Sequence, residues 1–382
     1  MTMIAALLVF VLVAPAQKRD VEEKGIRERT FTVSKGGQLE VSVRTGDIRI
    51  NPWTKNEVHV RAEGIDEEDL DRLRMTQSGN TIRVEFRPRG GWDGWNGSPR
   101  FEISIPSEFN VTMKTSGGDL EVTGGVNGRI EGSTSGGDIK LNNVTGTVDV
   151  STSGGDIRVG DISGNAELST SGGDIEIRKV EGEANVRTSG GDIKVESVGR
   201  KLEAKTSGGD IQIGDVGGEA NVSTAGGDVR VGKVSGDARL RTAGGNIVLR
   251  GASGRVNAGT AGGDIELESI SGSIEAKTAG GDIRAELIPT GRGSSELKTA
   301  GGNIRLAVPE NAKATIEAII RIEGRWGSRK ERYEIRSDFT ATTYRKDDEY
   351  EEIRATYVLN GGGEKILLET VNSNIEIRKL HR

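Results

Sequence analysis

An acidic residue recurs at a nearly constant spacing through the middle of the chain and could bind a divalent cation. The column consists of Asp119, Asp138, Asp156, Asp174, Asp192, Asp210, Asp228, Asn246, Asp264, Asp282 and Asn303. Calcium-binding β-helical repeats use a nine-residue unit that supplies several oxygens to each ion. Here the column supplies only one acidic side chain per 18 residues, and Asn246 and Asn303 keep the acceptor oxygen without the charge. The pattern therefore favours a structural role, with the side-chain oxygen accepting a backbone N–H at a corner, over a calcium ladder.

A glycine-rich loop between Gly90 and Pro99 is the second candidate site. Its predicted ligand-binding residues are Trp92, Asp93, Trp95 and Asn96. Two exposed aromatic faces beside polar groups can stack on sugars or contact a protein. The alternative is that the loop folds back as an apolar cap over the first coil.

A third candidate is the column of residues that precede a recurring threonine. It contains six basic residues, four serines and no acid: Lys114, Ser133, Ser151, Ser169, Arg187, Lys205, Ser223, Arg241, Gly259, Lys277 and Lys298. Such a strip could contact an anionic glycan or a lipid head group. The alternative is a solvated sheet face that charge keeps soluble.

Residues suited to catalysis or to cofactor binding are scarce. The chain has no Cys and only two His, His59 and His381, which excludes thiolate chemistry and a multi-His zinc site. A polysaccharide lyase or hydrolase on a β-helix needs two or three carboxylates, or an acid with a Lys or Arg, at positions that break the repeat. The one insertion, at 287–293, adds only Arg292 to the charges. We therefore expect no catalytic residue, metal or cofactor, with a glycan-processing enzyme as the alternative.

These candidates are positioned by a repeat. The motif T-[SA]-G-G-[DN] occurs eleven times between Thr115 and Thr299, at a spacing of 19 once, 18 eight times and 21 once. In the unit that begins at Asp174, apolar residues fall one, three, six, ten and twelve positions later. Alternation in each half predicts two strands, and the change of parity predicts a corner. The sequence thus predicts an all-β parallel β-helix, or solenoid, of about eleven 18-residue coils stacked about 4.8 Å apart.

Three side-chain patterns support this geometry. Where one of the two inward residues late in the unit is large, the other is Ala, as at Ala184/Val186 and Leu202/Ala204, which keeps the layer volume constant. The repeated threonine has inward parity, so its hydroxyl is expected to bond a backbone group. The Gly-Gly pair is expected to supply positive φ at a sharp corner.

The composition agrees with a thin hydrophobic core to which each repeat adds one layer. The 382 residues include 57 Gly, 33% are apolar and only 4% are aromatic. The 52 basic and 58 acidic side chains are intermixed and give a net charge of −6, a balance that does not predict nucleic-acid binding.

The ends of the chain differ from the repeats. Residues 4–13 are unbroken apolar and precede Ala14-Pro15-Ala16, which predicts a signal peptide at 1–16 and export to the periplasm, cell surface or exterior. No later segment is apolar enough to span a bilayer. A linker is expected at 17–27, an N-terminal capping region with an enlarged coil at 28–113, the regular solenoid at 114–306 and a C-terminal capping region, rich in strands, at 307–382.

Several motifs outside and inside the repeats resemble one bacterial family. They are GGQLEVSV at 36–43, GDIRI at 46–50, Ile105-Pro106, the serial T-S-G-G-D-I units and GEKILLET at 363–370. Together they resemble the "putative adhesin" domain of unknown function. The resemblance implies an envelope-associated β-solenoid to which no catalytic residues are assigned. With the signal segment, it leads us to expect an exported, non-catalytic, adhesin-like protein whose partner is an envelope glycan or protein.

The repeat makes a prediction about modularity. Because each coil should contact only its neighbours, deletion of one whole unit, Asp174 to Gly191, should shorten the rod and leave it folded. Deletion of nine residues should disrupt folding, since it places outward side chains in the core. Thermal melts followed by circular dichroism measure both, and equal loss of structure in the two variants would contradict the register.

Overall fold

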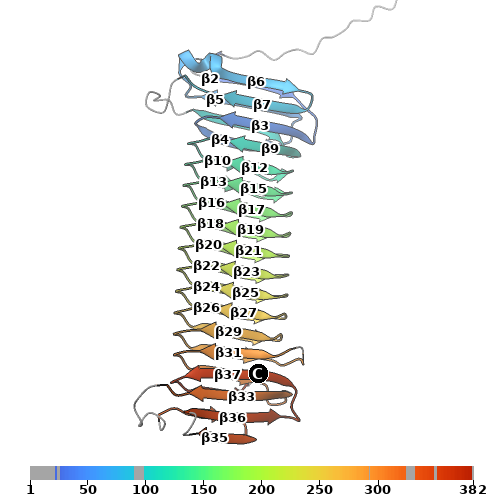
Figure 1. Cartoon of the computed structure of the whole chain (residues 1–382). Coiled ribbons are helices and arrows are strands. Elements are labelled where there is room, and N and C mark those ends of the chain that lie inside the picture. The colour runs from blue at the N-terminus through green and yellow to red at the C-terminus, as the bar shows by residue number, and fades with distance from the viewer. Residues whose placement is uncertain are drawn as a thin grey trace, which may run out of the picture.

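The chain forms a rod of stacked coils, shown in Figure 1. The computed structural model describes residues 22–23, 26–89, 99–291, 293–323, 332–347 and 351–380. Each regular coil supplies one strand to sheet A and one to sheet B, and equivalent strands of successive coils pair in parallel, as in Ile175 with Ile193 and Ala184 with Leu202. The predicted all-β parallel β-helix is confirmed.

The regular coils repeat these two strands along the rod. In sheet A they are β10 (Leu120–Val122), β13 (Ile139–Leu141), β16 (Ile157–Ile162), β18 (Ile175–Val180), β20 (Ile193–Val198), β22 (Ile211–Val216), β24 (Val229–Val234), β26 (Ile247–Ala252), β28 (Ile265–Ile270), β30 (Ile283–Leu287) and β32 (Ile304–Val308), with short β11 (Val126–Asn127) and β14 (Val144–Thr145). In sheet B they are β12 (Ile130–Ser133), β15 (Val148–Ser151), β17 (Ala166–Ser169), β19 (Ala184–Arg187), β21 (Leu202–Lys205), β23 (Ala220–Ser223), β25 (Ala238–Arg241), β27 (Val256–Gly259), β29 (Ile274–Thr278) and β31 (Ser295–Thr299).

The core is a stack of aliphatic layers between the two sheets. The inward positions that the repeat predicted are all buried in the unit that begins at Asp174, where Ile175, Ile177 and Val180 face Ala184 and Val186. Each layer repeats this small cross-section, so the rod needs few aromatic side chains.

The paired glycines are required by close approach, which corrects the expected role of positive φ. The described glycines at positive φ do not include any member of the eleven Gly-Gly pairs. A Cβ on the second glycine of each pair would instead lie 1.9–2.2 Å from the carbonyl oxygen of the equivalent glycine one coil earlier. Real Cβ atoms do not come this close to another atom, so only glycine allows the corners to stack.

The repeated threonine joins the corners of neighbouring coils. Thr170 is buried, and its hydroxyl donates to the carbonyl oxygen of Gly155, one coil earlier, at 2.9 Å. The same hydroxyl accepts the N–H of Gly173 in its own corner at 3.3 Å. The threonine therefore satisfies two buried backbone groups that would otherwise lack a partner.

At the N-terminal end, the chain wraps back over its first coil. In sheet B the order is β6 (Leu73–Ser78), β7 (Thr81–Phe86), β3 (Gly37–Val43) and β9 (Phe109–Lys114), and β9 then pairs with β12. In sheet A it is β1 (Glu22–Glu23), β2 (Ile26–Thr32), β5 (Glu57–Glu63), β8 (Arg100–Pro106) and β4 (Asp47–Trp53), and β4 then pairs with β10. A 3-10 helix, η1 (Glu67–Arg72), precedes β6. The outermost pairs are antiparallel, so the regular coils do not present an open edge at this end.

The C-terminal end is built in the same way. Sheet B continues from β31 through β37 (Glu364–Val371), β33 (Ala314–Arg321) and β36 (Glu352–Leu359) to β35 (Thr343–Asp347). Sheet A continues from β32 through β38 (Ile375–Lys379) to β34 (Ile335–Ser337). As the repeat pattern at its end predicted, Ile375 pairs with Ile304 although 71 positions separate them.

The close approach at the corner predicts different effects for two neighbouring glycines. In Gly173→Ala the new Cβ would lie 2.1 Å from the carbonyl oxygen of Gly155, so the variant should lose about 2 kcal/mol or more of unfolding free energy. In the matched control Gly172→Ala the nearest atom, the carbonyl oxygen of Gly154, lies 3.5 Å away, and the loss should be below about 1 kcal/mol. Denaturant melts compare the two, and equal stability would contradict the steric explanation.

Candidate functional site

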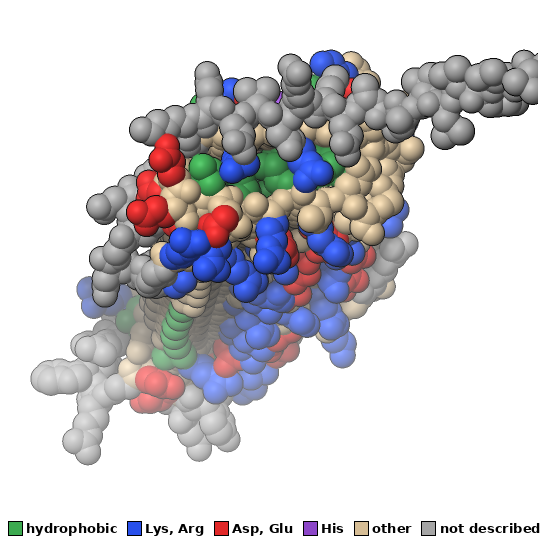
Figure 2. Space-filling model, turned by 90° about the horizontal axis from the view of Figure 1, so that it is seen from above, with side chains coloured by type: hydrophobic (Ala, Val, Ile, Leu, Met, Phe, Trp, Pro, Cys, Tyr) green, Lys and Arg blue, Asp and Glu red, His purple; other side chains and the backbone are tan. Residues whose placement is uncertain are grey.

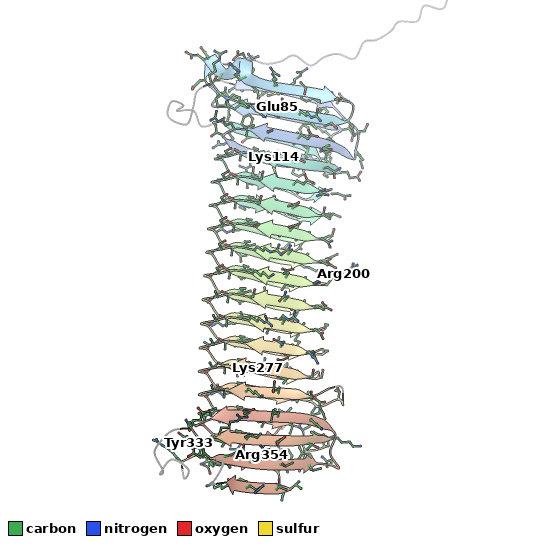
Figure 3. All side chains as sticks on the ribbon, in the orientation of Figure 1. Glu85, Lys114, Arg200, Lys277, Tyr333 and Arg354 are labelled. Carbon is green, nitrogen blue, oxygen red and sulfur yellow. The ribbon has the colours of Figure 1, made fainter. Side chains whose placement is uncertain are left out.

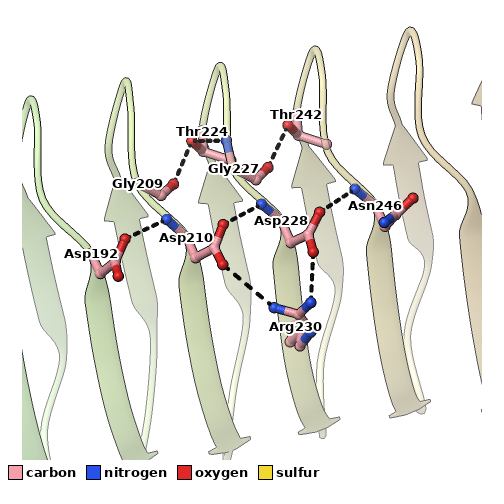
Figure 4. A network of polar contacts seen from close by, with 9 residues as sticks. All are labelled: Asp192, Gly209, Asp210, Thr224, Gly227, Asp228, Arg230, Thr242 and Asn246. Atoms are coloured by element: carbon pink, nitrogen blue, oxygen red, sulfur yellow. Dashed lines mark hydrogen bonds and ion pairs between the residues drawn. The ribbon is translucent and has the colours of Figure 1, made fainter.

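The Asp/Asn column forms a continuous hydrogen-bond ladder along one corner of the rod (Figure 4). The Oδ1 atom of each member from Asp119 to Asp282 accepts the backbone N–H of the next member, one coil later, at 2.7–2.9 Å. The bond therefore crosses between coils instead of closing a turn within one coil. The Oδ1 of Asp47 in the N-terminal cap begins the ladder by accepting the N–H of Asp119. In the C-terminal cap Asn303 accepts the N–H of Asn374, and Asn374 accepts the N–H of Glu334.

The ladder uses an acceptor oxygen, and the negative charge is not needed for the bond. Asn246 accepts the N–H of Asp264 at 2.8 Å, the same distance as the aspartates give. Some of the remaining carboxylate oxygens pair with arginine, as Asp228 does with Arg230 at 2.6 Å. Within the described residues, no three His, Cys, Asp or Glu side chains lie close enough together to hold a metal ion.

The predicted ligand-binding loop lies outside the described residues. Trp92, Asp93, Trp95 and Asn96 all fall within 90–98. The chain enters this loop from β7 in sheet B and leaves it into β8 in sheet A, as it does at each T-x-G-G-D corner. Both flanks are anchored, because the backbone N–H of Arg89 bonds buried Asp69 at 2.8 Å and the carbonyl of Pro99 accepts the N–H of Asp47 at 3.1 Å.

The described histidine lies in the N-terminal cap. The side chain of His59 is half-buried, and its Nδ1 forms a hydrogen bond with the hydroxyl of Thr30 at 3.0 Å. The ring centroid of Trp53 lies 6.4 Å away, and the Lys55 ammonium stands 4.7 Å above the Trp53 ring. These contacts lie at the connection between β4 and β5. His381 lies outside the described residues.

The outer face of sheet B carries charges that largely pair with one another. Figure 2 shows Lys and Arg interspersed with Asp and Glu along the side of the rod. Lys277, labelled in Figure 3, bridges Glu275 at 2.9 Å and Glu296 at 3.0 Å. Lys298 extends the chain of contacts from Glu296 at 2.8 Å to the C-terminal cap. The ammonium groups lower the pKa of Glu275 and of Glu296, so both carboxylates are held ionised.

A polar groove crosses this face where the regular coils meet the C-terminal cap. Its volume is about 620 Å³, and it runs over β29, β31, β37, β33 and β36. The polar and charged residues that line it are Arg255, Ser273, Glu275, Ser294, Ser295, Glu296, Thr315, Glu317, Thr356 and Lys365. The groove was missed from sequence, although the spacing of 21 between the last two motifs marks this coil as irregular.

A buried carboxyl group anchors the chain beside this groove. Glu364 begins β37, and it accepts the N–H of Gly291 and the hydroxyl of Ser295, each at 3.3 Å. Burial is the main influence on this group and raises its pKa. Glu364 thus holds the insertion before β31 against the C-terminal cap.

The repeated ladder and two-sheet coil agree with a known family. The model described as Toastrack DUF4097 matches residues 37–216 and, in a second overlapping match, residues 200–322. The chain belongs to the Toastrack DUF4097 family. The resemblance to a domain of unknown function seen in the sequence is therefore confirmed. No curated protein matches the chain significantly.

Several solved structures resemble this Toastrack protein at low identity. A "putative adhesin" from Bacteroides fragilis is 13% identical over 94% of this chain and 98% of its own, with a TM-score of 0.23. A "putative adhesin" from Parabacteroides merdae is 11% identical over 94% and 97%, with a TM-score of 0.28. A "putative lipid binding protein" from Parabacteroides distasonis is 12% identical over 94% and 97%, with a TM-score of 0.24. At these TM-scores none of the three bears on what the Toastrack chain does.

The ladder of this Toastrack protein predicts that Asp192 acts through its acceptor oxygen. Asp192→Asn should change the unfolding free energy little, whereas Asp192→Ala should cost about 1 kcal/mol because the N–H of Asp210 loses its partner. Millimolar calcium should leave the melting temperature of the wild type unchanged. A rise of many degrees with calcium, reversed by a chelator, would instead support a metal ladder.

Proposed function

We propose that this protein is an exported, non-catalytic rod of the bacterial cell envelope that binds or displays envelope material in an adhesin-like way. The uniform outer surface of the coils is the observation that carries the proposal. Each coil presents nearly the same shallow strand faces as the last, with corners tied by ladders of backbone and side-chain hydrogen bonds. Such a surface offers extended contact with a polymer and little enclosure for a small molecule.

Export is supported by the predicted signal peptide at 1–16. In the part of the chain that the structure describes, no helix has the length and apolarity needed to cross a bilayer. A rigid rod joined to the envelope or released from it would present its sides to glycans or proteins.

The electrostatics of the groove support binding over glycan cleavage. A general acid in a glycosidase needs a raised pKa, so that the carboxyl keeps its proton near neutral pH. In Glu275 and Glu296 the shift is in the opposite direction, because Lys277 and Lys298 stabilise the ionised form. Glu317 is similarly paired with Arg354, labelled in Figure 3, at 2.7 Å. The carboxylates that line the groove are thus in ion pairs, and Glu364 beside it, whose pKa burial raises, is occupied by hydrogen bonds from Gly291 and Ser295.

The loop at 90–98 is the part of the protein that we propose contacts a ligand first. It replaces a tight T-x-G-G-D corner with a longer segment that carries Trp92, Asp93, Trp95 and Asn96. Anchored flanks limit the ordering entropy that binding would cost, and paired tryptophans commonly supply much of a binding free energy.

This assignment predicts that the loop governs binding to envelope material. Trp92→Ala/Trp95→Ala should reduce retention on purified envelope fractions at least about tenfold without a change in melting temperature. Retention is measured in pull-downs at low and high salt, with localisation of the tagged full chain in cell fractions as a separate readout of export. Wild-type binding by the double variant would exclude the loop, and a cytoplasmic location would overturn the proposed function.

A further inference from the structure

Two arginines on β25 stand on the outer face of sheet B without an acidic partner. Arg239 and Arg241 lie two residues apart on one strand, so their side chains share a face, and both are exposed. Within the described residues, neither forms an ion pair or a side-chain hydrogen bond. We call this pair the arginine site.

The strands on either side of the arginine site carry no charge on this face. The residues paired with the two arginines in register are Asn221 and Ser223 on β23, and Asn257 and Gly259 on β27. The acid nearest in sequence is Asp237, whose Oδ1 accepts the N–H of Arg255 at 2.8 Å. The guanidinium groups therefore face solvent beside small and amide side chains, of which Asn257 donates its Nδ2 to Glu275 at 3.0 Å and keeps its amide oxygen as an acceptor.

Apart from Lys114 at the N-terminal end, the other described cations of the column that contains Arg241 are neutralised. Arg187 and Lys205 occupy the same column as Arg241, and both pair with Glu203, at 2.9 and 2.6 Å. Two coils beyond the arginine site, Lys277 pairs with Glu275 at 2.9 Å. The division of the column into paired and unpaired cations depends on the outward residue two positions earlier on the same strand, which is Glu before Lys205, Lys277 and Lys298 and is Arg239 before Arg241.

Gly259 leaves an open space directly beside Arg241. It is not at positive φ, and the only atom near a Cβ placed there would be the carbonyl oxygen of Lys277 at 3.9 Å. Backbone geometry therefore does not require glycine at this position, in contrast to the corner glycines. The missing side chain makes room for a ligand group against the Arg241 guanidinium.

The arginine site continues into the polar groove. Arg255 is exposed, and it lies diagonally across from Arg239, because its register partner is Asp237, two residues earlier on that side. Arg255 also lines the groove, in which Ser273 and Thr315 add hydroxyl groups. Arg255 therefore lies between the arginine site and the groove, whose glutamates are already in ion pairs.

We propose that the arginine site binds carboxylate groups of an acidic polysaccharide. The proposal rests on the proposed role in binding envelope material and names the chemistry of the bound polymer. Planar guanidinium groups match carboxylates in a two-point geometry, and the neighbouring amide and hydroxyl groups suit sugar hydroxyls.

The surroundings disfavour other polyanions. Glu203 and Glu275 carry negative charge two coils away on either side of β25. A flat anionic membrane or a densely charged nucleic acid laid along the rod would meet these carboxylates. The strands that carry and flank the arginine site also present no aromatic side chain for base stacking.

Binding of polygalacturonate oligomers to the full chain tests the proposal. At low salt, Arg239→Gln/Arg241→Gln should weaken binding at least about tenfold, because two charge-assisted contacts are lost. The matched control Arg187→Gln/Lys205→Gln removes two cations that already have a partner and should change affinity less than about twofold. Melting temperatures of both variants verify that the rod stays folded.

A second pair of variants tests the open space at Gly259. Gly259→Glu places a carboxylate beside Arg241 and should weaken binding as strongly as loss of the arginines. Gly259→Gln has nearly the same size and no charge, so it should weaken binding through loss of the space alone, and by less than Gly259→Glu. Single-stranded DNA of matched charge and anionic phospholipid vesicles are run in parallel and should bind weakly.

The outcomes separate this inference from the proposed function. Equal losses in the two double-charge variants, or binding of DNA or vesicles that exceeds binding of the oligomers, would overturn the arginine site. Retention on envelope fractions without any binding of polygalacturonate would overturn it while leaving the proposed function intact. Arginine-dependent binding by a protein found in the cytoplasm would support the site and overturn the proposed function.

Discussion

The structure depends on how closely the backbone of each corner approaches the corner before it. Successive coils are hydrogen-bonded along both sheets, so their separation is set by strand pairing at about 4.8 Å. At the second glycine of each pair, this separation leaves no room for a Cβ. Glycine at that point permits a tight corner. The threonine hydroxyl and the aspartate oxygen then form hydrogen bonds with backbone groups of the corner that have no partner in either sheet. The same requirement recurs once in each coil of the repeat.

The caps cover the two ends of the stack of coils. A parallel stack would expose unpaired N–H and C=O groups at both ends. At one end, strands β5 to β8 follow β4 in sequence but lie outside it. At the other end, strands β33 to β36 precede β37 and β38 in sequence but lie outside them. Sequence order and spatial order therefore differ in the caps, although they agree throughout the regular coils.

The charged surface follows from stacking as well. A side chain on one coil meets its counterparts 18 residues earlier and later, so every outward column becomes a row of close neighbours. Where acids and bases meet, as at Glu203, they pair and lower the pKa of the carboxyl group. Where neutral residues meet a base, as around Arg241, the positive charge remains available. The same repeat thus gives the outer face of sheet B mostly paired charges, with the arginine site as a local exception.

Much of this protein could be predicted from the sequence alone. Strict periodicity determined the fold class, the inward columns and the continuation of the repeat at Asp47 and Asn374, because each depends only on the alternation of side chains along a strand and on a constant coil length. The reason for the paired glycines, the crossing of the aspartate bond to the next coil and the groove beside Glu364 were decided by tertiary structure. Each of these depends on distances between atoms of different coils. A repeat pattern specifies which residues stack, whereas the closeness of their backbones and the partners that their side chains reach are set only when the coils pack.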